Sequence, residues 1–111
     1  MDTTLTQFKH CDLIKVTGRI DSATAPKFAE ALDSVMNDGR YKIVLDLESV
    51  EFMSSAGLRV LISAQKVCKR YNRGEVVLAL VPQRVYEAMD LAGFVPLFKF
   101  FEDVTGAVGS F

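Results

Sequence analysis

The chain has 111 residues, half of them hydrophobic, which suits one domain with one apolar core over residues 1–111. Its 13 basic and 14 acidic residues leave a net charge of −1, so the sequence lacks the basic excess of proteins that bind nucleic acid or anionic membranes directly. Two cysteines, Cys11 and Cys68, do not form a disulfide framework, and His10 is the only histidine. We expect buried, reduced thiols and neither a metal nor a cofactor.

The N-terminal residues 1–9 are polar and do not resemble a signal peptide. No apolar run approaches the roughly 20 residues that a membrane-spanning helix needs. We therefore expect a cytoplasmic protein without membrane insertion.

The first elements are two strands and a helix. Residues 5–9 predict a weak strand, and residues 13–17 predict a stronger strand that ends at Gly18. Residues 24–37 then change to the three- and four-residue apolar spacing of a helix with one buried face. Thr24 is placed to cap this helix, Pro26 falls in its first turn, and Gly39 ends it.

The second half of the chain continues the alternation. Residues 41–47 and 76–81 predict buried strands, and residues 55–73 predict the clearest helix. A third helix starts at Pro82 and ends at Gly93, followed by an edge strand at 97–100 and a short helix at 103–109. The residues of the 55–73 helix that we expect to face inward are Leu58, Leu61, Ile62, Cys68 and Tyr71. Its expected polar face comprises Arg59, Ser63, Lys66, Arg70 and Arg73. In the third helix, the residues expected to face inward are Val85, Ala88, Met89 and Ala92.

This order predicts an α/β fold: a single layered domain with a four- to five-stranded, mostly parallel sheet and three to four helices. Site residues in such sheets gather at the carboxyl ends of the strands. Two predicted loops fall there, residues 18–24 and residues 48–55.

Ser54 and Ser55 lie at the start of the clearest helix, where two interpretations are open. A serine at this position caps free backbone N–H groups. A phosphate on Ser55 would also be favoured by the positive end of the helix dipole and would add a charge of about −1.5 to −2. Such a modification would alter partner binding and spare the fold. Gly57 would let the first turn pack closely on the sheet and leave the hydroxyl accessible.

Three other features have plain structural interpretations. Asp21 either caps the following helix or belongs to an acidic binding surface, and Asp46 lies in a buried strand where a structural hydrogen bond is expected. The aromatic residues between Phe94 and Phe101 form either an edge strand with core packing or a contact surface. No phosphate-binding loop or GxSxG motif is present, so we expect no enzymatic activity.

The segments Gly18-Arg19-Ile20-Asp21, residues 43–47 and residues 50–58 (VEFMSSAGL) resemble a STAS domain of the bacterial anti-sigma-factor antagonist type. The resemblance implies the STAS fold and binding to an anti-sigma factor that is also a serine kinase, which releases a sigma factor. It further implies that phosphorylation of Ser55 ends binding and that a PP2C-type phosphatase restores it. The implied partner-binding residues are Asp21, Ser22, Ser54, Ser55, Ala56, Gly57 and Arg59.

The sequence departs from this family at two positions. Ser54 stands where aspartate is common, and Ala56 stands where a second hydroxyl residue is common, so Ser54 is a rival acceptor. A second hypothesis is a constitutively bound STAS subunit of a membrane lipid-transport or transporter complex, in which Ser55 is only a cap. A third is a small enzyme or nucleotide-binding domain.

Overall fold

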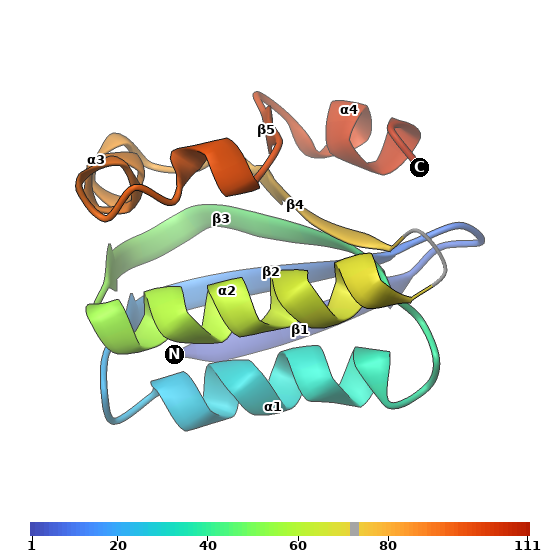
Figure 1. Cartoon of the computed structure of the whole chain (residues 1–111), viewed down its shortest axis with the longest axis horizontal. Coiled ribbons are helices and arrows are strands. Elements are labelled where there is room, and N and C mark those ends of the chain that lie inside the picture. The colour runs from blue at the N-terminus through green and yellow to red at the C-terminus, as the bar shows by residue number, and fades with distance from the viewer. Residues whose placement is uncertain (72–73) are drawn as a thin grey trace.

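The computed structural model describes residues 1–71 and 74–111, and its helices and strands alternate along the chain (Figure 1). The elements in chain order are β1 (Asp2–Gln7), β2 (Asp12–Ile20), α1 (Ala25–Met36), β3 (Lys42–Met53), α2 (Ser55–Arg70), β4 (Glu75–Ala79), α3 (Gln83–Leu91), the 3₁₀ turn η1 (Val95–Leu97), β5 (Phe100–Phe101) and α4 (Val104–Gly109).

The five strands form one sheet in the order β1-β2-β3-β4-β5. In the part of the chain that the structure describes, the β1–β2 pair is antiparallel and every later pair is parallel. The predicted α/β fold with a mostly parallel sheet is therefore confirmed. Because successive right-handed crossovers advance in one direction across the sheet, they place α1, α2 and α3 on the same face.

Burial divides the core into two layers, one on each face of the sheet. The larger layer joins alternate residues of β3 and β4, such as Leu45 and Leu78, to the inner faces of α1, α2 and α3. The smaller layer joins Val44, Val77 and Ala79 to Ala107 of α4. Figure 1 shows α1 and α2 side by side along the sheet, with α4 near the C-terminus.

Two strands extend further than expected. The predicted loop at residues 48–55 is wrong, because β3 continues to Met53, and the predicted loop at 18–24 begins only after Ile20. The two strands pair in parallel as far as Ile20 and Met53, with two register shifts on the way. Val50 and Met53 are buried, whereas the polar residues of this extension, Glu48, Ser49 and Glu51, are exposed to solvent.

Several local predictions need smaller corrections. The first strand is Asp2–Gln7, not residues 5–9. The last strand is Phe100–Phe101, not residues 97–100, and Leu97 belongs to the 3₁₀ turn that precedes it. Ala92 is exposed beyond the end of α3, not inward. Tyr71 is exposed and stacks on Tyr41 at the end of α2, and the predicted polar residue Arg73 lies outside the described residues.

Both cysteines are buried, as expected, and they are unpaired with each other. Burial raises the pKa of the Cys68 thiol to about 11 and also raises the pKa of Cys11. Because the thiolate is the reactive form, both side chains behave at neutral pH as small apolar groups.

Candidate functional site

The candidate site lies where β2 and β3 end together. Ile20 and Met53 are the last paired residues of the two strands, and the backbone N–H of Ser54 donates to the carbonyl of Ile20 over 2.8 Å. The start of the β2–α1 loop and the start of α2 are thus joined directly. The expectation that the Asp21 and Ser55 segments open on one edge of the sheet is confirmed.

Ser54 is the N-cap of α2. Its backbone is extended, and its hydroxyl oxygen accepts a hydrogen bond from the backbone N–H of Gly57 at 3.4 Å. Its carbonyl accepts the first intrahelical bond, from Leu58 at 3.0 Å. The side chain is half-buried. Ser54 therefore has the structural role that the sequence allowed for either serine.

Ser55 is the first residue of α2 and is exposed to solvent. Within the described residues, its hydroxyl has no hydrogen-bond partner. The first turn of α2 contains no acidic side chain, so no carboxylate already occupies the positive end of the helix dipole. The structure thus separates the two serines: one hydroxyl holds the helix start and the other faces outward.

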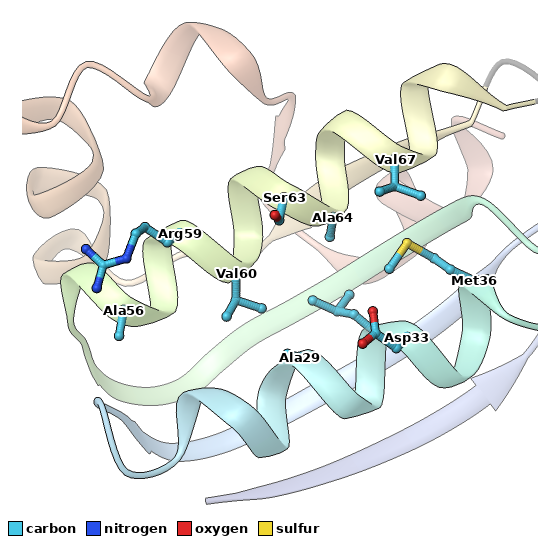
Figure 2. A pocket seen from close by; sticks show the side chains of 10 residues that line it. Ala29, Asp33, Met36, Ala56, Arg59, Val60, Ser63, Ala64 and Val67 are labelled. Carbon is cyan, nitrogen blue, oxygen red and sulfur yellow. The ribbon is translucent and has the colours of Figure 1, made fainter.

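Arg59 is the positive side chain that belongs to the same helical face. It follows Ser55 by four residues, a spacing that places two side chains on neighbouring positions of a helix surface. Arg59 is exposed and lies near the start of α2, next to Ala56 (Figure 2). An anion on Ser55 would therefore meet free helix N–H groups and a nearby guanidinium.

Gly57 fixes how closely the first turn of α2 approaches the strands. A Cβ at this position would lie 2.7 Å from Cγ2 of Ile20 and 2.8 Å from Cγ of Met53. Both distances are too short for carbon atoms, so only glycine fits without displacement of these two buried side chains. The packing interpretation of Gly57 is confirmed.

Asp21 stabilises the turn that leads into α1. Its Oδ1 accepts hydrogen bonds from the backbone N–H groups of Ala23 at 3.0 Å and Thr24 at 3.1 Å. The Thr24 N–H is also the main cause that lowers the pKa of the Asp21 carboxyl below its usual value. Thr24 is the N-cap residue of α1, but its hydroxyl donates to the Arg19 carbonyl and makes no capping bond. Ser22, next to Asp21, is exposed.

One contact at this end of the molecule was missed by the sequence reasoning. The guanidinium of Arg19 lies 4.7 Å from the ring centroid of Phe52, across the paired ends of β2 and β3. This contact depends on a strand pairing that residues 48–55 did not reveal, since they were interpreted as a loop. It places a positive charge and an aromatic ring beside the Asp21 and Ser55 segments.

An apolar groove runs from the candidate site along the contact between α1 and α2 (Figure 2). Its volume is about 410 Å³, and Ala56 and Val60 line it from α2 while Ala29 and Met36 line it from α1. Arg59 and Asp33 add one charge of each sign. A partner that contacts Ser55 and Arg59 would therefore find an apolar surface directly beside them.

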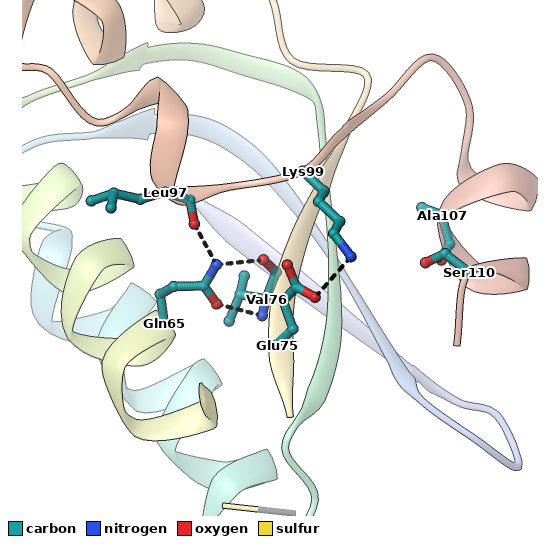
Figure 3. Close-up of polar contacts among 7 residues, drawn as sticks. All are labelled: Gln65, Glu75, Val76, Leu97, Lys99, Ala107 and Ser110. Carbon is teal, nitrogen blue, oxygen red and sulfur yellow. Dashed lines mark hydrogen bonds and ion pairs between the residues drawn. The ribbon is translucent and has the colours of Figure 1, made fainter. Parts of the chain in front are cut away.

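Asp46 and Gln65 are buried polar side chains, and both form hydrogen bonds with the backbone. Asp46 accepts from the Glu48 N–H at 3.1 Å, which confirms its structural interpretation. Gln65 on α2 accepts from the Val76 N–H at 2.7 Å and donates to the carbonyls of Val76 at 3.1 Å and Leu97 at 2.8 Å (Figure 3). Gln65 was missed, although its spacing from Leu61 and Cys68 places it on the buried face of the helix.

In residues 1–71 and 74–111, no group of three or more His, Cys, Asp or Glu side chains is arranged to hold a metal ion. Within the same residues, no helix is both long enough and apolar enough to cross a bilayer.

The fold and the site where β2 and β3 end together define a small α/β domain that presents a serine at the start of a helix. The family model of the STAS domain matches residues 3–107, and the chain belongs to this family. The chain is 31% identical to the putative anti-sigma factor antagonist BtrV of Bordetella bronchiseptica, over 85% of this chain and 80% of that protein. It is 32% identical to the anti-sigma-F factor antagonist RsfB of Mycobacterium tuberculosis, over 87% of this chain and 81% of that protein.

Solved structures agree on the fold. An anti-sigma factor antagonist from Mycobacterium paratuberculosis superimposes with a TM-score of 0.87 at 24% identity, and the match covers 98% of this chain and 92% of that one. The STAS fold implied by the sequence resemblance is therefore confirmed.

Proposed function

We propose that this protein is an anti-sigma-factor antagonist whose binding is switched by phosphorylation of Ser55. In its unmodified form it binds an anti-sigma factor that is also a serine kinase, and the sigma factor is released. Phosphorylation of Ser55 by that kinase ends the binding, and a PP2C-type phosphatase restores it. The protein itself acts as a binding partner and not as an enzyme, in the cytoplasm, where transcription takes place.

The observation that carries this proposal is the division of roles between two adjacent hydroxyls. Ser54 caps α2 through Gly57, whereas Ser55 is exposed and its hydroxyl makes no hydrogen bond within the described residues. A kinase can reach the Ser55 hydroxyl without breaking the cap. The resulting phosphate would lie at a helix N-terminus, near Arg59, where an anion is stabilised.

The relatives support the same class of function. BtrV and RsfB carry names as anti-sigma factor antagonists and align with most of this chain. They do not favour the alternative of a constitutively bound subunit of a membrane transport complex. The proposed binding surface comprises the Asp21 and Ser22 turn, the first turn of α2 from Ser54 to Gly57, and Arg59.

The test is to incubate the protein with the anti-sigma kinase that co-purifies with it, in the presence of ATP, and to map the phosphate by mass spectrometry. We expect one phosphate on Ser55, complete loss of labelling in Ser55→Ala, and retained labelling in Ser54→Ala. Full labelling of Ser55→Ala would contradict the assignment and favour Ser54.

Binding is tested separately from labelling. Ser55→Asp should weaken binding to the kinase at least tenfold, because the carboxylate places a charge inside the contact surface. Ser34→Asp, an exposed change on α1, is the matched control and should bind normally. If Ser55→Asp bound as tightly as the wild type, the site would not act as an electrostatic switch.

A further inference from the structure

A second hollow lies at the carboxyl ends of β4 and β5, where α3 begins. Its volume is about 640 Å³. Val81 and Pro82 line it after β4, Tyr86 lines it from α3, and Phe101 lines it from β5, while Glu48 and Glu102 supply its charges. Ligands of open parallel sheets bind outside the carboxyl ends of the strands, which is the position of this hollow.

The walls of the hollow present aromatic rings to solvent. Tyr86 is 40% exposed, and its ring packs edge-on against Phe100, with ring centroids 5.2 Å apart and an interplanar angle of 69°. Phe100 and Phe101 are both half-buried. The face of an aromatic ring carries negative potential, so such walls attract a cation as well as apolar groups.

The charges of the hollow are all of one sign. Glu48 and Glu102 are exposed, and neither forms an ion pair with a cation among the described residues. Among residues 1–71 and 74–111, no lysine or arginine lines the hollow. The Glu48 backbone is held in place by Asp46, which adds a third carboxylate close to this strand end. The surroundings therefore complement a positive group.

The backbone around the hollow is held in an uncommon conformation. Leu80 has a φ of +56°, in the left-handed region that side-chain-bearing residues rarely adopt. Its N–H donates to the carbonyl of Phe101 over 3.0 Å, which ties the end of β4 to β5. A strained residue persists where the surrounding contacts hold it in place. Here the hydrogen bond between Leu80 and Phe101 also fixes two walls of the hollow relative to each other.

We propose that this acidic, aromatic hollow receives an arginine side chain from a basic segment of a partner protein. A guanidinium stacks on aromatic rings and also forms paired hydrogen bonds with carboxylates, so it matches both features of the hollow. Small-molecule sites enclose most of their ligand, whereas every residue that lines this hollow is exposed or only half-buried. An open site suits a side chain that a larger partner delivers.

The hollow is separate from the proposed phosphorylation site. β3 continues from Glu48 to Met53 before Ser55 is reached, so the two sites lie at opposite ends of this extension. Occupancy of the hollow therefore does not depend on Ser55, and Ser55→Ala should leave it unchanged.

The test is a ¹H–¹⁵N NMR titration with the blocked peptide Ac-Gly-Arg-Gly-NH₂ and its neutral analogue, in which citrulline replaces arginine. We expect saturable shifts at the amides of Leu80, Phe101 and Glu102 with the arginine peptide, and much smaller shifts with the citrulline peptide. Glu102→Gln should weaken binding roughly three- to fivefold, the scale of one exposed ion pair. Glu30→Gln, an exposed change on α1, should have no effect.

Tyr86→Leu is a second variant and should also weaken binding by about threefold, since the ring face is lost. Glu102 is exposed, so its variant keeps the test valid even if Tyr86→Leu disturbs α3. Equal shifts with both peptides, or no saturable shift at these amides, would overturn the proposal. Spermidine that bound as tightly as the arginine peptide would assign the hollow to a free polyamine and would also overturn it.

Discussion

The first turn of α2 and its middle turns differ in how their polar side chains are used. The first turn is held by one capping hydroxyl and by the close approach of Gly57, and it leaves Ser55 exposed. The middle turns bury Gln65, whose amide makes three hydrogen bonds to segments far along the chain. The difference shows that the groups that anchor the helix are distinct from the exposed Ser55 hydroxyl, which we propose to be the phosphorylation site. A charge added at Ser55 would leave every anchor in place.

Gln65 anchors α2 by completing the edge of the sheet. On the side of β4 that faces β5, Leu78 is bonded to Lys99 and Leu80 to Phe101, but β5 is too short to reach Val76. The Gln65 amide both accepts from and donates to the Val76 backbone, as a neighbouring strand would (Figure 3). One side chain of α2 therefore replaces a missing segment of strand.

Because of this role, a substitution of Gln65 should reduce the stability of the fold more than substitutions of Gly57, Ser54 or Ser55. Gln65→Leu keeps the side-chain volume but leaves the buried N–H and carbonyl of Val76 without partners, so we expect the free energy of unfolding to fall by about 3 kcal/mol. Urea denaturation followed by circular dichroism measures the change. Lys66→Ala, an exposed neighbour on the same helix, should change stability by less than about 0.5 kcal/mol. Equal stability of the two variants would show that the amide is not an anchor.

Gly57→Ala tests the close approach of the first turn. The added methyl group must displace Ile20 and Met53, and overpacking of this kind costs about 1–3 kcal/mol, partly offset by the better helix propensity of alanine. We expect a net loss of about 1.5 kcal/mol in thermal or urea unfolding. Gly109→Ala is the matched control at the end of α4, where a Cβ meets no atom within 4 Å. If Gly57→Ala left the stability unchanged, Ile20 and Met53 would be able to move aside at little energetic cost.

The sequence predicted the periodic elements well because their signals are local. The helical spacing of α1 and the buried run in β3 and β4 need no knowledge of distant residues. The extension of β3 to Met53 was missed, since polar Glu48, Ser49 and Glu51 make sense in a strand only when β2 lies beside it. The 3₁₀ turn before β5, Val95–Leu97, was missed for a related reason, because the aromatic residues that flank it match an edge strand equally well.

The candidate site was predictable in position but not in detail. Residue types and the family resemblance located both serines and Asp21 at one edge of the sheet. The division between Ser54 as cap and Ser55 as exposed hydroxyl depends on backbone angles, which adjacent identical residues do not reveal. Gln65 was missed because its partners, Val76 and Leu97, lie 11 and 32 residues further along the chain.

Ser54→Ala should have a smaller effect than either change above. It removes the cap of α2, which typically costs about 0.5–2 kcal/mol of stability for an N-cap serine. Because the capping hydrogen bond is long, at 3.4 Å, we expect a loss toward the lower end of this range. Ser54→Asp retains a capping oxygen and should unfold within about 0.3 kcal/mol of the wild type. If both variants lost the same stability, the hydroxyl would not be the cap.

Ser55 should matter least for stability, although it matters most for the proposed function. Its side chain is exposed, so Ser55→Ala should change the free energy of unfolding by less than about 0.5 kcal/mol. Ser55→Asp adds a negative charge at the positive end of α2 and should stabilise the fold by a few tenths of a kcal/mol, about 0.3, at low ionic strength. Unfolding in about 0.02 M and 1 M salt measures both, since salt should screen the gain of the aspartate variant. A loss of more than about 1 kcal/mol in Ser55→Asp would mean that the anion disturbs the anchors as well as the surface, and the separation between the two parts of α2 would fail.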